Sequence, residues 1–271
     1  MRSIVHISDV HFGDTDPGVV ERLVEKMNEL APDLVVVSGD LTQRARSSQF
    51  QEARAFFDRI PKPQIIVPGN HDVPLYNVFH RFVSPLAKFK KYITPDLSPS
   101  YVDDEMAVVG INTARSLTIK GGRISEEQIA ELEAKLCAVD EGKMKIVVTH
   151  HPFDLPEGFH EDDIVGRAKM VMPRLALCGA DVFLAGHLHV SHVTQSAHRY
   201  RMDNGYSALI IQAGTATSRR PRGEDNSFNL LELDHPVLKV KRFQCSIPDA
   251  GFYLATTEQF TRTEVGWERI S

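Results

Sequence analysis

Apolar positions in the first part of the chain alternate between short continuous runs and longer stretches with helical spacing. Apolar residues at 19, 20, 23, 24, 27 and 30 recur every three or four positions, which predicts an amphipathic helix over 18–30. The other elements predicted here are strands at 3–8, 34–38 and 64–67 and a helix at 47–60. Strands that alternate with helices in this way predict a parallel sheet covered by helices.

Turn and capping residues define the elements in the middle of the chain. Ser84 followed by Pro85 resembles an N-cap and a first helical position, which predicts a helix that ends near 93. Ser125 and Gln128 have the spacing of a capping box and predict a helix over 125–139. A hairpin is expected over 102–110, with its turn in the acidic run that begins at Asp103.

The remainder of the chain is rich in predicted strands. Strands at 144–149 and 181–185 enclose a predicted helix at 166–177, and the strands from 190 onward are expected to pair consecutively and antiparallel. We therefore expect one domain over residues 1–245. The tail over 246–271 is expected to pack on the body of the protein or on a partner chain, which leaves a homodimer open.

The charge balance limits the classes of partner. The formal net charge of the 271 residues is −5, so no global positive field favours nucleic acid, and no nucleic-acid partner is expected. A negative protein that acts on phosphate groups needs local positive charge, and bound metal ions are one source of it.

The cysteines and the N-terminal residues indicate the cellular compartment of the protein. The neighbours of Cys137, Cys178 and Cys245 are typical of helix or strand interiors. Three cysteines cannot form a complete disulfide framework, so buried thiols in a reducing compartment are expected. Polar residues from His6 onward interrupt the N-terminal apolar run, unlike a signal peptide, and no run of about 18 apolar residues predicts a membrane span. The sequence therefore predicts a cytoplasmic protein.

Residue types that bind metal ions follow five of the predicted strands. The segments are Asp9-Val10-His11, Gly39-Asp40, Gly69-Asn70-His71-Asp72, His150-His151-Pro152 and Gly186-His187-Leu188-His189. Ligands gather beyond the carboxyl ends of strands in open α/β sheets, so we expect these segments to converge. Each one alone is also typical of a turn or a surface loop, but their order and strand context together favour a metal site.

The spacing of these residues and the types of their donor atoms support a shared metal site. Along an extended backbone residues i and i+2 point the same way, so Asp9 with His11, and His187 with His189, are each expected to reach one locality. Imidazole suits Zn, Fe and related ions, whereas carboxylate and amide oxygens suit harder ions such as Mn. A mixed nitrogen and oxygen set without thiolate argues against a structural zinc site of the cysteine type.

In this order the segments resemble the motifs of the calcineurin-like metallophosphoesterases. The matching pattern is D-x-H, GD, GNHD, a histidine after an apolar strand and GHxH, and it runs from Asp9 to His189 without a missing position. Within that family the chain is similar to the bacterial class III cyclic nucleotide phosphodiesterase and glycerophosphodiesterase branch. The resemblance implies an α/β fold, a four-layer αββα sandwich of two mixed β-sheets flanked by helices, with a dimetal site at one edge.

The resemblance also implies how two metal ions are held. One ion would be bound by Asp9, His11, Asp40 and His189, and the other by Asp40, Asn70, His150 and His187, so that Asp40 bridges them. The ions are expected to be Mn, Fe or Zn, and this donor set does not choose among them. The family pattern favours His150 over His151 as the ligand in that pair.

The chemistry expected at such a centre gives the remaining residues their roles. Two cations about 3.5–4 Å apart can clamp both ends of a displacement at phosphorus and activate a bridging hydroxide as the nucleophile. His71 is then expected to assist the leaving group, although it could instead hydrogen-bond a carbonyl and shape its loop. Asp72 is expected to orient His71 or to support the site from outside.

The expected activity is hydrolysis of small phosphodiesters, with cyclic nucleotides or glycerophosphodiesters as the substrate classes. A phosphomonoesterase or nucleotide pyrophosphatase on the same centre is the alternative, because the metal chemistry does not separate these reactions. A non-catalytic scaffold of the same fold is disfavoured, since every ligand position and His71 are filled.

The segment 76–93 has three interpretations. It combines aromatic residues with Arg81, Lys88, Lys90 and Lys91. We expect an ordinary amphipathic surface helix whose aromatic side chains enter the core. A cap over the active site is the second interpretation, and contact with a membrane is the least favoured.

Overall fold

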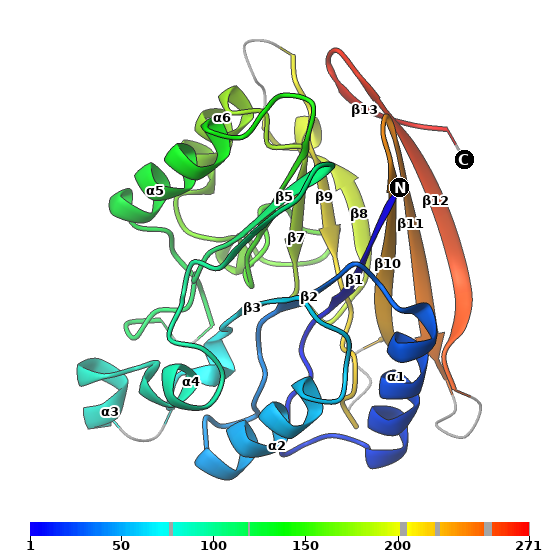
Figure 1. Cartoon of the computed structure of the whole chain (residues 1–271). Helices are drawn as coiled ribbons and strands as arrows, with labels where there is room; N and C mark the ends of the chain where they lie inside the picture. The colour runs from blue at the N-terminus through cyan, green and yellow to red at the C-terminus, as the bar shows by residue number, and fades with distance from the viewer. Residues whose placement is uncertain (76–77, 119, 201–204, 220–222, 247–250, 271) are drawn as a thin grey trace.

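The protein is a sandwich of two β-sheets with helices on both outer faces (Figure 1). The computed structural model describes residues 1–75, 78–118, 120–200, 205–219, 223–246 and 251–270. The layer order confirms the four-layer αββα fold of two mixed sheets that the sequence motifs imply.

The first sheet contains the N-terminal and C-terminal strands, in the order β13-β12-β11-β10-β1-β2-β3. Their bounds are β1 (Arg2–Ile7), β2 (Leu34–Ser38), β3 (Gln64–Val67), β10 (Asn226–Asp234), β11 (Val237–Cys245), β12 (Tyr253–Thr263) and β13 (Gly266–Arg269). β1, β2 and β3 are parallel, and the strands from β10 to β13 pair antiparallel. The helices α1 (Pro17–Leu30) and α2 (Ser47–Phe57) supply apolar side chains to the core on the outer face of this sheet.

The second sheet has the order β4-β5-β6-β7-β9-β8. Its strands are β4 (Ser100–Val102), β5 (Met106–Gly110), β6 (Met144–Val148), β7 (Val182–Ala185), β8 (His192–Gln195) and β9 (Leu209–Gln212). β5, β6, β7 and β9 are parallel, and the two edge strands are antiparallel to their neighbours. Helices α5 (Glu126–Cys137) and α6 (Ala168–Leu177) share a core with this sheet on its outer face.

Local signals explain where the long helices begin. The Asp16 side chain accepts a hydrogen bond from the backbone N–H of Gly18, and Pro17 takes the first helical position, where its missing N–H costs nothing. Ser125 and Gln128 form the capping box expected for α5. The apolar positions of α1 are buried as their spacing predicts.

Two expectations from the sequence are wrong in detail. The strands after 190 do not form one antiparallel series, because β9 enters the second sheet parallel to β7 while β10 enters the first. The helix expected from Ser84 begins at Ala87 with Leu86 as its N-cap, giving α4 (Ala87–Tyr92), and α3 (Val78–Val83) precedes it. Local patterns define strands but do not specify their partners.

The strands β12 and β13, which follow Ser246, belong to the first sheet, since β12 pairs with β11 from Tyr253 to Thr261 and with β13. Asp181 links this segment to the second sheet. Its Oδ1 lies 3.0 Å from Arg262 Nε, and its backbone carbonyl accepts a hydrogen bond from the indole of Trp267. A buried carboxylate thus ties the C-terminal strands to the opposite layer.

The expectation that all three cysteines are thiols is also wrong. Cys137 and Cys178 form a disulfide between the ends of α5 and α6, with Cα atoms 4.6 Å apart, and Cys245 lies buried elsewhere. The apolar neighbours of the two cysteines reflect the packing of both helices on one sheet, which brings the two ends together. Among the described residues, no helix is both long and apolar enough to cross a bilayer.

The disulfide should contribute to stability. It closes a loop with a sequence separation of 41 residues. Cross-linking a chain at this separation restricts the unfolded state, so reduction should lower the free energy of unfolding by up to about 4 kcal/mol. Urea unfolding with and without reductant measures this difference. Cys137→Ser is the matched control, because its unfolding curve should not respond to reductant; an equal midpoint for the oxidised and reduced wild-type protein contradicts the prediction.

Candidate metal centre

The carboxyl ends of strands from both sheets meet at one edge of the sandwich. Loops after β1 and β2 are joined by a hydrogen bond from the Asp9 N–H to the Gly39 carbonyl, 3.1 Å. Loops after β6 and β7 are joined by one from the Gly186 N–H to the His150 carbonyl, also 3.1 Å. All five segments expected to converge therefore lie around one site, to which they bring the side chains described below.

The first group of donors consists of Asp9, His11 and His189. Asp9 Oδ1 lies 3.5 Å from His11 Nε2 and 3.4 Å from His189 Nε2, and the two nitrogens are 3.4 Å apart. Donors about 2.1 Å from one ion at tetrahedral angles would be about 3.4 Å from each other. Asp9 Oδ1 is buried and has no hydrogen-bond partner among the described residues. The spacing and the unpaired oxygen both fit a cation between the three atoms.

The second group is built around Asp40, Asn70 and His150. His150 Nε2 lies 3.4 Å from Asp40 Oδ1 and 3.0 Å from the amide oxygen of Asn70. The His187 ring is next to this group, with its centroid 5.1 Å from that of His150. The other Asp40 oxygen, Oδ2, is 3.8 Å from His11 Nε2. The Asp40 carboxylate thus faces both groups, as a bridging ligand must.

Hydrogen bonds to the far side of two rings aim their Nε2 atoms at the site. His150 Nδ1 is 2.8 Å from the Ser38 carbonyl, and His189 Nδ1 contacts the Thr215 hydroxyl. A carbonyl can only accept, so Nδ1 of His150 carries a proton and Nε2 is the ring nitrogen left to bind a metal ion. Outer contacts of this kind fix the tautomer of a metal-binding histidine.

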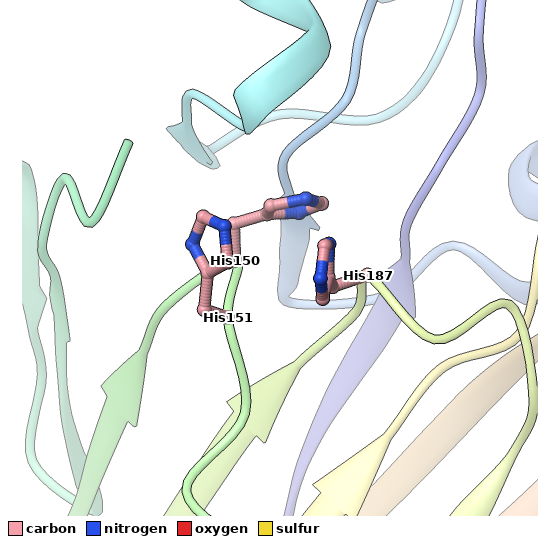
Figure 2. A group of neighbouring side chains, drawn as sticks. All are labelled: His150, His151 and His187. Carbon is pink, nitrogen blue, oxygen red and sulfur yellow. The ribbon is translucent and has the colours of Figure 1, made fainter. Parts of the chain in front are cut away.

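His151 is close to the second group, but both of its ring nitrogens are engaged elsewhere. Figure 2 shows the rings of His150 and His151 leaving the chain in different directions. His151 Nε2 is 2.7 Å from the Lys120 carbonyl and Nδ1 is 2.8 Å from the Thr113 hydroxyl. Nε2 must donate to the carbonyl, so Nδ1 accepts from Thr113. Burial, together with the nearby His187 and His150, lowers the pKa of His151 well below its usual value.

The backbone that carries these side chains is not extended, in contrast to what the sequence predicted. β1 ends at Ile7, and the residues beyond it are not extended. The five residues with left-handed backbone at the site are Asp9, His11, Asp40, His187 and His189, with φ between 49° and 76°. The expectation that an extended backbone directs residues i and i+2 to the same side is therefore wrong here. A non-glycine residue in this region costs on the order of 1 kcal/mol or more, so strained backbone is concentrated at the site.

Two glycines allow the loops to come close enough. A Cβ on Gly69 would lie 2.1 Å from Asp40 Oδ1. A Cβ on Gly39 would lie 2.6 Å from His150 Nδ1, and its φ of +95° also favours glycine. Any larger residue at either position would displace a candidate ligand.

The site attracts positive charge. Burial disfavours the charged form of Asp40, yet the nearby His150, His71 and His11 hold the pKa of this carboxyl well below its usual value. Burial likewise opposes charge on His150, but Asp40 raises the pKa of this imidazole to about 9. Two buried carboxylates, Asp9 and Asp40, therefore require cationic partners, and metal ions are suitable ones.

His71 and Asp72 have different surroundings. His71 lines the cavity beside the site, with Nδ1 3.0 Å from the Gln43 carbonyl and Nε2 4.0 Å from Asp40 Oδ2. Asp72 is buried, and its carboxylate accepts hydrogen bonds from the N–H groups of Leu41, Thr42 and Gly69. Asp72 thus joins the Asp40 loop to the Asn70 loop, while the ring of His71 is oriented by a carbonyl.

A cavity of about 450 Å³ opens over the donor groups. Its lining includes Asp40, Asn70, His71, His187 and His189, together with Arg44, Arg81, Lys120, Phe159 and Asp163. Sequence reasoning missed Asp163, whose Oδ1 is 3.8 Å from His187 Nε2, and the orienting residues Thr113 and Thr215. Thr215 follows the carboxyl end of β9, so its position after a strand could have identified it as a candidate site residue.

Comparison with known proteins agrees with this arrangement. The family model of the calcineurin-like phosphoesterases matches residues 2–191. The chain belongs to the calcineurin-like phosphoesterase family, and its fold and site define it as a metallophosphoesterase of that family.

Two relatives fall in the branch that the motifs indicate. The chain is 29% identical over 167 residues to glycerophosphodiester phosphodiesterase GpdQ of Enterobacter lignolyticus, a match covering 57% of this chain and 58% of that protein. It is thus aligned over less than two thirds of that relative's length. It is 24% identical over 236 residues to a protein of Xenorhabdus bovienii named as a probable cyclic nucleotide phosphodiesterase, covering 86% of this chain and 90% of the relative.

The fold is also similar to that of a dimetal phosphatase from Danio rerio. The TM-score is 0.68 at 15% identity, and the match covers 97% of this chain and 99% of the other. At that identity the likeness concerns the fold alone.

Proposed function

We propose that the protein hydrolyses phosphodiesters at a centre for two metal ions. Asp9, His11, Asp40 and His189 would hold one ion, and Asp40, Asn70, His150 and His187 the other. The observation that carries the proposal is the position of the Asp40 carboxylate, with Oδ1 3.4 Å from His150 Nε2 and Oδ2 3.8 Å from His11 Nε2. One carboxylate between two sets of donors is the arrangement that a pair of cations requires.

The residues of the chain would bind the substrate and handle the proton. When bound, the two cations offset charge on the phosphoryl oxygens and lower the pKa of a solvent nucleophile. His71 donates Nδ1–H to the Gln43 carbonyl, which directs Nε2 toward the cavity. As an imidazolium, His71 would hold a proton at Nε2 for the oxygen of the leaving alcohol. Arg44 and Lys120 line the same cavity and would attract an anionic substrate.

The names of the relatives support cyclic nucleotides or glycerophosphodiesters as the substrate class. A cavity of about 450 Å³ is large enough for molecules of that size. A phosphomonoesterase on the same centre is the alternative, because the donors that bind the cations are common to both reactions.

A panel of esters tests the proposal. The protein is loaded in turn with Mn, Zn and Fe, its metal content is measured, and bis-aryl and mono-aryl phosphates are compared, followed by cyclic AMP and glycerophosphodiesters. We expect a higher kcat/KM for the diester of the matched aryl pair. Higher values for the monoester would contradict the diesterase assignment. Two bound ions without turnover of any ester would favour a non-catalytic scaffold.

A further inference from the structure

The helix α3 carries an apolar face that the packing of the protein leaves outside. The exposed fractions are 70% for Phe79, 55% for Phe82 and 66% for Val83. Residues three and four apart lie on the same side of a helix, so the three side chains form one face. The expectation that aromatic residues of 76–93 enter the core holds for Phe89, which is fully buried, and is wrong for Phe79 and Phe82.

Arg81 holds α3 against a neighbouring loop. The side chain is buried, and its guanidinium donates to the carbonyls of Pro74, Ser116 and Thr118 at 3.1, 2.7 and 2.6 Å. Leu117, between two of these carbonyls, is 87% exposed. Phe79, Phe82 and Val83 together are called the α3 apolar face. Because Arg81 fixes one side of the helix, this face is exposed in the folded protein.

The charged residues close to α3 in the sequence favour an anionic occupant for this face. Between Asp72 and Asp96 the sequence has no acidic residue, although the chain as a whole has a net charge of −5. The same stretch contains Lys90 and Lys91, which are exposed on α4 only a few residues after α3. A second copy docked across a two-fold axis would bring like charges together. An anionic surface complements both the lysines and the apolar side chains.

The helix α3 lies beside the cavity over the donor groups. Arg81 and Leu75 line the same cavity as His71 and His187. A surface that binds α3 would therefore lie near the entrance to that cavity.

We propose that the α3 apolar face docks on an anionic phospholipid bilayer. Phe79 and Phe82 enter the boundary between headgroups and acyl chains, and Lys90 and Lys91 contact the headgroup phosphates. This inference goes beyond the phosphodiesterase activity and does not depend on it, since binding can be measured without turnover.

Flotation of the full-length protein with lipid vesicles tests the proposal. Wild-type protein should float with vesicles of phosphatidylcholine that contain phosphatidylglycerol, and much less with phosphatidylcholine alone. The double variant F79S/F82S should lower the partition coefficient by at least about tenfold, because two large apolar side chains no longer leave water. Both positions are exposed, so the variant should keep the wild-type melting temperature.

The matched control is Leu177→Ser, which removes an apolar side chain that is 81% exposed at the end of α6, away from α3. It should float like the wild type. Failure of the wild type to float with either vesicle, or equal flotation of F79S/F82S, overturns the proposal. So does a wild-type dimer in light scattering that F79S/F82S converts to monomer, because the α3 apolar face would then join two copies.

Discussion

Replacing Asp40 by alanine should remove nearly all of the proposed phosphodiesterase activity and reduce the metal content below two ions per chain. Asp40 is buried and faces both donor groups, with His150 on one side and His11 on the other. In the proposed centre, both ions would lose a ligand without this carboxylate, and the charge between them would no longer be balanced. We expect kcat/KM to fall by at least about 10³-fold, comparable to or greater than the loss of one preorganised group at a reacting centre.

The measurement combines elemental analysis with diester turnover at saturating metal. Asp58→Ala is the control, because Asp58 ends α2 on the surface and pairs with Arg54 away from the site. It should keep both metal and activity. An Asp40→Ala protein that retains two ions and wild-type turnover contradicts the bridging assignment, whereas loss of both ions together with activity supports it.

Replacing His71 by alanine should slow hydrolysis according to the quality of the leaving group. A general acid contributes about 10²–10⁴-fold when the departing alkoxide needs a proton. An aryl oxide of low pKa departs without one. We therefore expect a loss of at least about 10²-fold for an alkyl diester and a much smaller loss for a nitrophenyl diester, with metal content unchanged.

A second variant separates this role from the shaping of the loop. His71 Nδ1 is 3.0 Å from the Gln43 carbonyl, and the amide of His71→Gln can donate to the same oxygen. Glutamine carries no acidic proton at neutral pH, so His71→Gln should remain as slow as alanine on the alkyl diester. Recovery of wild-type rates by His71→Gln means that the ring only supports the loop, and the acid role is then wrong.

Much of the fold could be predicted because its signals are local. The spacing of apolar residues and the caps at Asp16 and Ser125 define α1 and α5 within short windows of sequence. Continuous apolar runs predicted β2 and β3 with their observed bounds. The pairing of β9 with β7, and of Cys137 with Cys178, required contacts between distant segments that no local pattern specifies.

The sequence by itself determined which donors are available and that they follow strand ends. The order of the motifs, from Asp9 to His189, was enough to predict a metal site and the family. The family resemblance implied how the donors are grouped, and only the tertiary structure shows which of their atoms face one another. The Asp40 carboxylate lies between two sets of atoms, and distant Thr113 and Lys120 hold His151 away from them. The physical reason is that a side chain's direction depends on backbone angles and neighbours supplied by other loops, here left-handed residues that packing holds in place.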